Sequence, residues 1–375
     1  MQRHMIAPRV AWQASVEKVG LTFHTLVDGS PYWDESAYWE FTAAEVDRLE
    51  AATAEIQRLC LIAAEHILAK DRFAEMKIPP AAVERICETW RTEPPALYGR
   101  LDLAFDGNEI KLLEYNADTP TALLEAAVVQ WYWLQNVFPE ADQFNCLHER
   151  LVAKWKDLKP HLAKTLYFGH DGSEEDSMTV AYLRDTAEQA GLRTASIAMH
   201  DVGWQQKRFR FVDLEQNPIE SIFKLYPWEW LLKEPFGVDA LPTMDAVTWI
   251  EPIWKMLWSN KALLAILWEL NPGHELLLPA YLDGPRRMKK FVRKPLLGRE
   301  GKGVEVFQNG EQGWSTVPVQ GDFVYQDLAP LVEANGKTAV LGSWLVDGEP
   351  VGIGIRESEG LVTTNLSRFV PHLFR

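Results

Sequence analysis

Two pairs of polar residues, Arg100 with Asp102 and Glu114 with Asn116, have types and spacing that could carry chemistry. One residue separates the members of each pair, so each pair shares a face if its segment is a β-strand. If the two segments pair with those faces together, an arginine, two carboxylates and an amide oxygen converge. Such oxygen ligands suit Mg²⁺, which binds few carboxylates and keeps positions free for substrate phosphates. The alternative is an exposed strand face on which Arg100 forms an ordinary surface salt bridge.

A glycine-rich segment, residues 294–303, forms the second candidate group. Glycines permit positive φ angles and close backbone approach, and successive N–H groups in such a loop can bind phosphate. The glycines are Gly298, Gly301 and Gly303. Lys294 and Arg299 add positive charge beside them. The segment does not match the Walker A pattern, so an ordinary loop between two strands is the alternative interpretation.

Three further features become informative together with these groups. Lys261 lies at the predicted start of a helix, where the positive end of the helix favours anions. Gln326 and Leu328 lie at the end of a predicted strand, which could supply backbone groups and apolar walls for a purine. Arg356 lies on a predicted strand that contains glycines. The ordinary alternatives are a solvated lysine, a plain strand end and a surface charge.

Two elements are predicted to position the first polar pairs. The segments Tyr98–Phe105 and Glu109–Tyr115 alternate in polarity around a glycine-containing turn, which predicts a β-hairpin. A long amphipathic helix is predicted over residues 42–69, where Thr42 and Glu45 form a capping box. This helix is interpreted as scaffold for the hairpin.

A strand–helix–strand pattern over residues 166–198 predicts a small Rossmann-like lobe. No G-x-G-x-x-G sequence accompanies it, so a dinucleotide fingerprint is absent. A later helix and a series of antiparallel strands indicate an α+β nucleotide-binding lobe. The predicted helices and strands in these regions cover residues 80–90, 122–137, 166–169, 177–190, 194–198, 260–270, 290–294, 304–307, 323–326, 338–346 and 350–355.

Charge and composition argue against several classes of protein. The 375 residues include 53 Asp and Glu against 38 Lys and Arg, and the net charge of -15 opposes binding to nucleic acid or an anionic membrane. The three cysteines form neither a disulfide framework nor a zinc-binding pattern. No secretory signal and no apolar stretch of ~20 residues is recognisable, so we expect a cytoplasmic protein without a membrane anchor.

Five motifs, in this order along the chain, resemble those of the glutathionylspermidine synthase family. They are Tyr98-Gly99-Arg100-Leu101-Asp102, Leu113-Glu114-Tyr115-Asn116-Ala117-Asp118-Thr119-Pro120, Ser259-Asn260-Lys261, Arg293-Lys294-Pro295 with Gly298-Arg299-Glu300-Gly301, and Tyr325-Gln326. The resemblance covers nearly the whole chain. It implies an α+β, ATP-grasp fold of the glutathione synthetase type and an ATP-dependent carboxylate–amine ligase. The amidase domain of bifunctional members has no room before Thr42, so hydrolase activity is not implied.

The resemblance also implies roles for individual residues. It implies Mg²⁺ ligands at Asp102, Glu114 and Asn116, and catalytic arginines at Arg100 and Arg356. It implies nucleotide-binding residues at Arg100, Lys261, Lys294, Gly298, Arg299, Gly301, Gly303, Gln326 and Leu328, with the glycines in a flexible lid. It implies substrate-binding residues at Thr119, Thr121, Glu174 and Glu175. The chain departs from glutathione-binding members where Thr119, Pro120 and Thr121 stand in place of serines and Leu225 in place of a threonine.

The predicted function is an ATP- and Mg²⁺-dependent ligase that joins a glutathione-like carboxylate to an amine, with spermidine as one candidate, through an acyl phosphate. The alternatives are the same chemistry on other small molecules, a kinase or phosphatase at the same metal site, and a catalytically silent nucleotide-binding protein. Asp118 and Glu125 are the nearest candidates for a general base. Three parts are expected: residues 1–160 with the metal-site hairpin, residues 161–245 as the pre-ATP-grasp Rossmann-like lobe, and residues 246–375 as the ATP-grasp lobe with the lid.

Overall fold

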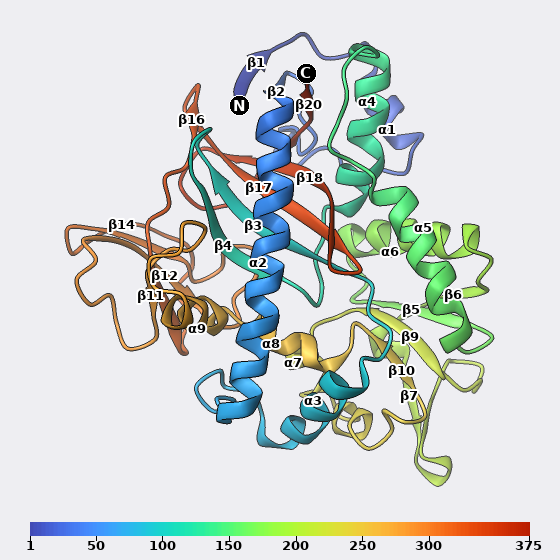
Figure 1. Cartoon of the computed structure of the whole chain (residues 1–375). Coiled ribbons are helices and arrows are strands. Elements are labelled where there is room, and N and C mark those ends of the chain that lie inside the picture. The colour runs from blue at the N-terminus through green and yellow to red at the C-terminus, as the bar shows by residue number, and fades with distance from the viewer.

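The computed structural model describes residues 1–375 and has a mixed α/β architecture (Figure 1). Its strands form sheets of six, five, four and three strands and one two-stranded ribbon. The two termini lie close together at the top of the view, because β1 (Gln2–Met5) and β20 (His372–Phe374) pair with opposite edges of β2 (Ala37–Phe41). Both ends of the chain are therefore held in one small sheet.

Helix α2 (Ala43–Lys70) crosses the middle of the molecule in Figure 1 and packs against the six-stranded sheet. Its predicted capping box is present, because the side chains of Thr42 and Glu45 each accept a hydrogen bond from the other's backbone N–H. On the buried side of the helix, the Thr53 hydroxyl lies 2.7 Å from the hydroxyl of Ser343 on the sheet. The helix thus supports the sheet from one face.

The six-stranded sheet carries the predicted hairpin. Its order is β19 (Arg368–Val370), β18 (Glu349–Ser358), β17 (Lys337–Val346), β3 (Tyr98–Phe105) and β4 (Ile110–Asn116), with β16 (Glu333–Ala334) also paired to β17. All neighbouring strands are antiparallel. The β3–β4 hairpin confirms the sequence prediction, and β3 pairs on its other edge with β17 from the far end of the chain. Residues 1–160 and 246–375 share this sheet, and the division into three parts stays a prediction.

The five-stranded sheet carries the glycine-rich segment. Its order is β11 (Ala280–Tyr281), β15 (Phe323–Asp327), β12 (Lys290–Pro295), β13 (Glu305–Gln308) and β14 (Glu311–Ser315), again antiparallel throughout. Helix α9 (Ala262–Leu270) packs against β11 and β15. The glycine-rich segment joins β12 to β13, as predicted. Strand β14 was not expected, because its sequence Glu-Gln-Gly-Trp-Ser lacks an apolar alternation.

A four-stranded parallel sheet contains the predicted strand–helix–strand unit. Its order is β10 (Thr248–Ile250), β9 (Ser221–Leu225), β5 (Leu166–His170) and β6 (Thr194–Ala198), with α6 (Glu174–Gln189) connecting β5 to β6. Helix α6 begins three residues earlier than predicted, because the Ser173 hydroxyl accepts from the N–H of Asp176 and caps it. The two faces of the sheet pack into different hydrophobic clusters, with Phe168 in one and Tyr167 in the other. A separate Rossmann-like lobe stays a prediction.

The remaining elements are short helices, turns and a two-stranded ribbon that connect the sheets or lie beside them. They are α1 (Trp12–Glu17), α3 (Pro80–Thr92), a π-helical turn (Glu125–Val129), α4 (Gln130–Val137), α5 (Leu147–Leu158), α7 (Trp228–Leu231), α8 (Met256–Ser259), β7 (Gly203–Gln205) and β8 (Arg210–Val212), with short 3₁₀ turns at 159–161, 199–201, 206–208, 237–240 and 253–255. The helix predicted over 122–137 is present, but the π-helical turn interrupts its regular geometry.

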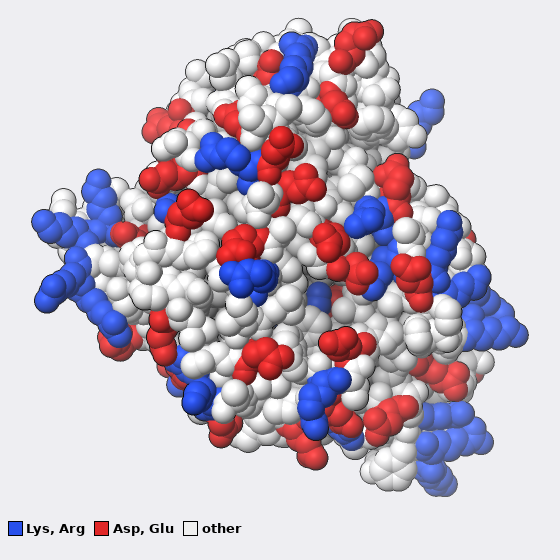
Figure 2. Space-filling model, in the orientation of Figure 1, with Lys and Arg blue, Asp and Glu red and all other residues white.

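Both signs of charge are interspersed on the face shown in Figure 2, and basic side chains gather mainly at its left and lower right margins. None of the helices is long and apolar enough to cross a lipid bilayer. Cys60, Cys87 and Cys146 are free thiols. The cytoplasmic location stays a prediction.

Candidate active site

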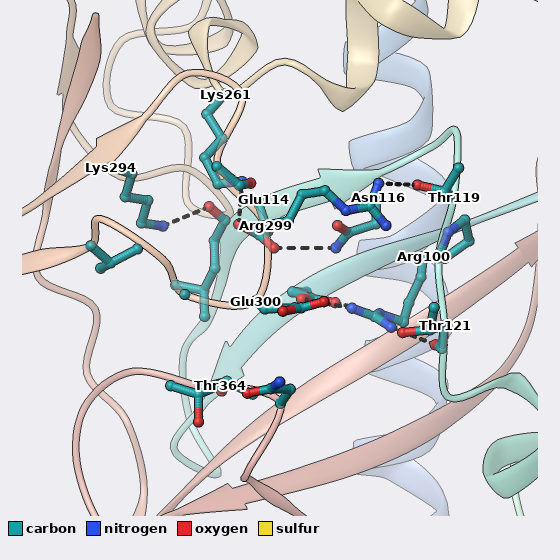
Figure 3. A pocket seen from close by; sticks show the side chains of 18 of the residues that line it. Arg100, Glu114, Asn116, Thr119, Thr121, Lys261, Lys294, Arg299, Glu300 and Thr364 are labelled. Carbon is teal, nitrogen blue, oxygen red and sulfur yellow. Dashed lines mark hydrogen bonds and ion pairs between the residues drawn. The ribbon is translucent and has the colours of Figure 1, made fainter. Parts of the chain in front are cut away.

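A cavity of about 460 Å³ receives side chains from the six-stranded, five-stranded and parallel sheets. Figure 3 shows part of its lining, with hairpin residues facing Lys261, which precedes α9, and Lys294 of β12. Every site residue implied by the motifs lines this cavity except Gly303, and of the two general-base candidates Asp118 lines it and Glu125 does not. The structure therefore brings together residues that lie more than two hundred positions apart in the chain, such as Arg100 and Arg356.

The four polar residues of the hairpin share one face, as predicted. Arg100 is opposite Asn116 and Asp102 is opposite Glu114 in the strand register. Arg100 Nε donates to Asp102 Oδ1 over 2.7 Å and Nη2 donates to Oδ2 over 3.2 Å. Arg100 Nη1 donates to the carbonyl of Thr121 over 2.6 Å. A guanidinium has five N–H donors, so one N–H on each Nη atom is left for a substrate.

The two facing carboxylates have different electrostatic surroundings. Lys261 Nζ lies 3.1 Å from Glu114 Oε2, and Asn116 Nδ2 donates to Glu114 Oε1 over 3.3 Å. Burial opposes ionisation of Glu114, but Lys261 and Lys294 together lower its pKa to about 2. Burial raises the pKa of Asp102, and the charge of Glu114 adds to this rise against the opposing effect of Arg100. Glu114 is therefore ionised, whereas the negative charge of Asp102 is only partly offset by its neighbours.

This donor set fits Mg²⁺. Two carboxylates and one amide side chain lie together on the paired strands of the hairpin. Such a small protein ligand set is expected where substrate phosphates and water complete the coordination of Mg²⁺. The raised pKa of Asp102 is a second observation in favour, because a divalent cation would offset its repulsion from Glu114.

Two buried lysines lie beside the hairpin. Lys261 directly precedes α9, and Asn260 Oδ1 accepts from the N–H of Ala262, the first residue of the helix. Lys294 Nζ on β12 donates to the carbonyl of Leu113 over 2.9 Å and to Gln326 Oε1 over 2.7 Å. Burial lowers the pKa of Lys294 to about 8. The site thus holds one lysine at a helix start and one whose charge is sensitive to pH.

The side chain of Gln326 is committed to holding Lys294. Its Oε1 accepts from Lys294, and its Nε2 donates to the carbonyl of Leu112 over 2.9 Å. The sequence motif marked Gln326 for adenine but did not indicate this positioning of Lys294. Leu328 follows the end of β15 and lines the cavity. Adenine contacts by Gln326 and Leu328 stay predictions.

The glycine-rich segment borders the cavity and reaches the loop that follows β4. Arg299 Nη1 donates to Thr119 Oγ1 over 2.5 Å, and its guanidinium carbon lies 5.3 Å from the centre of the Trp230 ring. The carbonyl of Gly298 accepts from Lys261 Nζ over 2.6 Å. The segment is therefore tied both to a predicted phosphate-binding lysine and to a predicted substrate residue (Figure 3).

The three glycines of this segment have different reasons to be glycine. Gly301 and Gly303 have φ angles of 71° and 73°, whereas Gly298 does not have a positive φ. A Cβ atom on Gly301 would lie 2.7 Å from the carbonyl oxygen of Thr363. A Cβ atom on Gly303 would lie 2.2 Å from the side chain of Val319, on the side away from the cavity. Gly303 therefore shapes the segment without lining the cavity.

Arg356 and the acidic pair lie at other parts of the lining. Arg356 on β18 donates from Nε to the carbonyl of Ser367 over 3.0 Å and from Nη2 to that of Thr364 over 2.9 Å. Glu174 and Glu175 occupy the first turn of α6, where the helix N-terminus favours negative charge. They line the cavity together with Asp171 and Asp176, and this part of the lining is acidic.

Sequence reasoning missed several charged residues of the lining. Glu229 lies on α7, and burial, together with the charge of Asp118, raises its pKa. Burial and the neighbouring Asp171 raise the pKa of Asp176 to about 7. Lys224 on β9 was also missed; it does not line the cavity but is fully buried and forms an ion pair with Asp118. A lysine within the otherwise apolar run Ile-Phe-Lys-Leu was a usable signal for this position.

The two candidate general bases have their carboxylates engaged. Asp118 accepts from Lys224 over 2.6 Å and from the N–H of Trp228 over 3.0 Å. Glu125 accepts from the hydroxyl of Tyr32 over 2.7 Å and does not line the cavity. Neither arrangement resembles a carboxylate poised to take a proton from a substrate.

Known proteins similar to this chain define its class. A Haemophilus influenzae protein, named provisionally as an acid–amine ligase, is 42% identical over 375 residues, covering 95% of both chains. Trypanothione synthetase of Crithidia fasciculata is 26% identical and covers 78% of this chain and 49% of its own length. The bifunctional glutathionylspermidine synthetase/amidase of Escherichia coli K12 is 25% identical, and the match covers 90% of this chain and 59% of that protein. This chain thus spans about half to three-fifths of these two longer relatives. It is an enzyme of the ATP-dependent acid–amine ligase class.

The family follows from the match over the whole chain. Residues 3–375 match the family described as glutathionylspermidine synthase preATP-grasp. The chain belongs to the glutathionylspermidine synthase family, as its five ordered motifs indicated.

Proposed function

We propose that this enzyme uses ATP to activate the carboxylate of a glutathione-like peptide and then joins it to an amine, with spermidine as one candidate. The observation that carries the proposal is that basic and acidic side chains line one cavity. Lys261, Lys294 and the glycine-rich segment contribute to this lining, and so do the carboxylates of α6 and α7. A polyanionic nucleotide could then bind beside the lysines, and a cationic amine beside the carboxylates.

The triphosphate would bind beside the two lysines and the glycine-rich segment. Lys261 and Lys294 supply positive charge, and the backbone of the glycine-rich segment supplies N–H donors. Asp102, Glu114 and Asn116 would hold Mg²⁺, which when bound offsets negative charge on the phosphates. An ATP-grasp arrangement, in which the nucleotide lies between the five-stranded and six-stranded sheets, is part of this proposal.

The first chemical step makes the carboxylate reactive. A carboxylate oxygen of the peptide attacks the γ-phosphorus, the bond from that phosphorus to the β,γ-bridging oxygen breaks, and ADP leaves. Arg100 has two free N–H groups for the resulting acyl phosphate, and Arg356 would hold its other oxygens. Fixed guanidinium groups are effective here because they need no reorientation as charge develops.

The second step forms the amide bond. The neutral amine nitrogen attacks the acyl carbon, phosphate leaves, and the nitrogen loses one proton. Asp176 and Glu229 line the cavity and have raised pKa values, so either could accept that proton better than Asp118 or Glu125. The glycine-rich segment would act as a lid that excludes water, because water would hydrolyse the acyl phosphate.

A second candidate function is the same ligase chemistry on a different donor. The observation that favours it is that Thr119, Thr121 and Leu225 line the cavity. The resemblance implies that these residues depart from glutathione-binding members, which have serines in the first region and a threonine in place of Leu225. Leu225 removes a hydrogen-bonding group from the predicted peptide site.

The test is ADP release measured against a matrix of peptides and amines, with amide products identified by mass spectrometry. The proposal expects ADP release and amide formation in equal amounts with glutathione and spermidine. ADP release with a different pair would favour the second candidate. An absence of ADP release with every pair would reject both.

A further inference from the structure

A buried ion pair joins the parallel sheet to the loop that follows the hairpin. Lys224 on β9 is fully buried and Asp118 is 2% exposed, and Lys224 Nζ lies 2.6 Å from Asp118 Oδ1. The same Nζ donates to the carbonyl of Tyr226 over 3.0 Å and lies 4.7 Å from the centre of the Trp228 ring. The N–H of Trp228 donates to Asp118 Oδ2 over 3.0 Å. Both carboxylate oxygens of Asp118 are thus fixed from the same side.

The loop held by Asp118, residues 117–121, borders the cavity and makes two other contacts with site residues. Thr119 Oγ1 accepts from Arg299 of the glycine-rich segment. The carbonyl of Thr121 accepts from Arg100 Nη1 over 2.6 Å. Three residues of one short loop therefore connect the parallel sheet, the lid segment and the arginine of the hairpin.

The direction of the Arg100 guanidinium depends on this loop. Two of its hydrogen bonds go to Asp102, which belongs to the same strand. The bond to the Thr121 carbonyl is the hydrogen bond that comes from outside the hairpin, and the guanidinium carbon also lies 5.7 Å from the centre of the Trp344 ring on β17. If the loop shifts, Arg100 keeps its paired contact with Asp102 but loses the acceptor that holds Nη1, and the guanidinium can then turn together with the Asp102 carboxylate.

Stability alone does not account for the ion pair. Removing two charges from water is unfavourable, and a well-packed apolar pair of similar volume is often as stable as a buried salt bridge. An apolar pair would lack the directional bonds that set the position of the Asp118 carboxylate. The arrangement is suited to fixing geometry.

We propose that Lys224 is a positioning residue for the ligase reaction, because through Asp118 it fixes the loop whose Thr121 carbonyl orients Arg100 toward the reacting carboxylate. This inference rests on the proposed role of Arg100. It assigns no direct contact between Lys224 and a substrate.

The first variant for the test is Lys224→Met, assayed for ADP release with ATP, MgCl₂, glutathione and spermidine. The kcat should fall about tenfold or more, while the Kd for ATP stays within about twofold, because the variant leaves Lys261 and Lys294 in place. An unchanged kcat would overturn the proposal.

A double variant separates positioning from stability. Asp118→Leu with Lys224→Met leaves no unpaired buried charge, so its Tm should recover relative to Lys224→Met. Its kcat should stay low. Recovery of kcat together with Tm would show that the pair acts only through stability, and would overturn the proposal.

A second buried ion pair provides the matched control. Lys255 Nζ lies 2.9 Å from Glu251 Oε2, both side chains are buried, and neither lines the cavity. Lys255→Met should lower Tm like Lys224→Met but keep kcat within about twofold when assayed below both Tm values. An equal loss of kcat in both single variants would also overturn the proposal.

A wrong choice of substrates can be distinguished from a failure of the inference about Lys224. If the wild-type enzyme releases no ADP with glutathione and spermidine, those substrates are wrong, and crystal structures of the wild type and Lys224→Met decide the inference. Loss of the contact between Arg100 and the Thr121 carbonyl in the variant would support it. An undisturbed contact would overturn it.

Discussion

Asp102 and Glu114 stand directly opposite each other on β3 and β4, yet their pKa values are displaced in opposite directions. The difference comes from their partners, because two lysines act on Glu114 while Asp102 shares one arginine with the loop beyond β4. The pair is thus an incompletely neutralised acidic site that a divalent cation would complete.

Removing either carboxylate should abolish turnover without unfolding the enzyme. Asp102→Asn and Glu114→Gln should each lower kcat for ADP release by at least ~100-fold. Each variant loses a proposed Mg²⁺ ligand, and without the bound Mg²⁺ the negative charge of the triphosphate is no longer offset. Steady-state kinetics and circular dichroism measure the two effects. Glu109→Gln, an exposed position in the turn of the same hairpin, is the control and should retain full activity. Near-normal turnover in either site variant would contradict the assignment of that residue as a Mg²⁺ ligand.

Nucleotide affinity should depend on pH through Lys294. Its pKa is lowered to about 8, so the ammonium group is charged below that pH and neutral above it. The Kd for ATP should be nearly constant from about pH 6.5 to 7.5 and rise by up to about tenfold per unit above pH 8. Lys294→Arg keeps a positive charge at all these pH values and should lose this dependence. Calorimetric titrations that show the same slope for both proteins would assign the effect to another group.

ATP should protect the glycine-rich segment from proteolysis. The Lys302 side chain is 70% exposed, so trypsin should cut there in the free enzyme. ATP with Mg²⁺ should slow this cut if the segment closes over the triphosphate. Cleavage in the exposed turn at Lys207 and Arg208 is the internal control and should not change. Equal protection at both places, or at neither, would argue for an ordinary surface loop.

Gly301 should be needed for coupling between ADP release and amide formation. Gly301→Ala introduces a Cβ atom 2.7 Å from the Thr363 carbonyl, so the segment cannot keep its position against residues 361–365. The ratio of amide to ADP, measured by mass spectrometry, should fall well below one as water reaches the acyl phosphate.

The matched control for this change is Gly310→Ala. Gly310 has a φ of 86°, similar to the 71° of Gly301, but its added Cβ would meet nothing within 4 Å. The strained φ should cost each variant roughly 1 kcal/mol of stability. Only Gly301→Ala should uncouple the reaction, and uncoupling in both variants would attribute the effect to lost stability.

The acidic pair on α6 should act on the amine alone. Glu174→Gln combined with Glu175→Gln should raise the KM for spermidine about tenfold and leave the Kd for ATP unchanged, because the lysines that offset the triphosphate are untouched. Glu188→Gln, near the other end of the same helix, is the control. An unchanged KM would indicate that other carboxylates of the lining, such as Asp171 or Glu229, bind the amine.

Local patterns made much of the site predictable. Alternation along residues 98–116 gave the hairpin, and its register then places Arg100, Asp102, Glu114 and Asn116 on one face. The capping box at Thr42 gave the start of α2. In both cases the interactions that determine the structure lie within a few residues of each other.

Contacts between distant segments were not predictable in the same way. Asp118 and Lys224 meet across two sheets, and nothing local to either residue specifies the partner. Gln326 was marked by a motif, but its bond to Lys294 depends on the pairing of β12 with β15. The shift in the pKa of Asp176 arises from burial by other elements and could not be read from α6 alone.

The pairing of β3 with β17 has a consequence for how the enzyme is made. Strand β3 is complete at residue 105, but the partner for its free edge ends only at Val346. During synthesis the hairpin edge must stay unpaired until most of the chain has left the ribosome, and closing so long a loop costs entropy. An unpaired edge can template aggregation, so slow translation or truncation before residue 346 should favour misassembly over a partly active product. Nascent chains of this enzyme are therefore expected to be clients of chaperones that shield exposed strands.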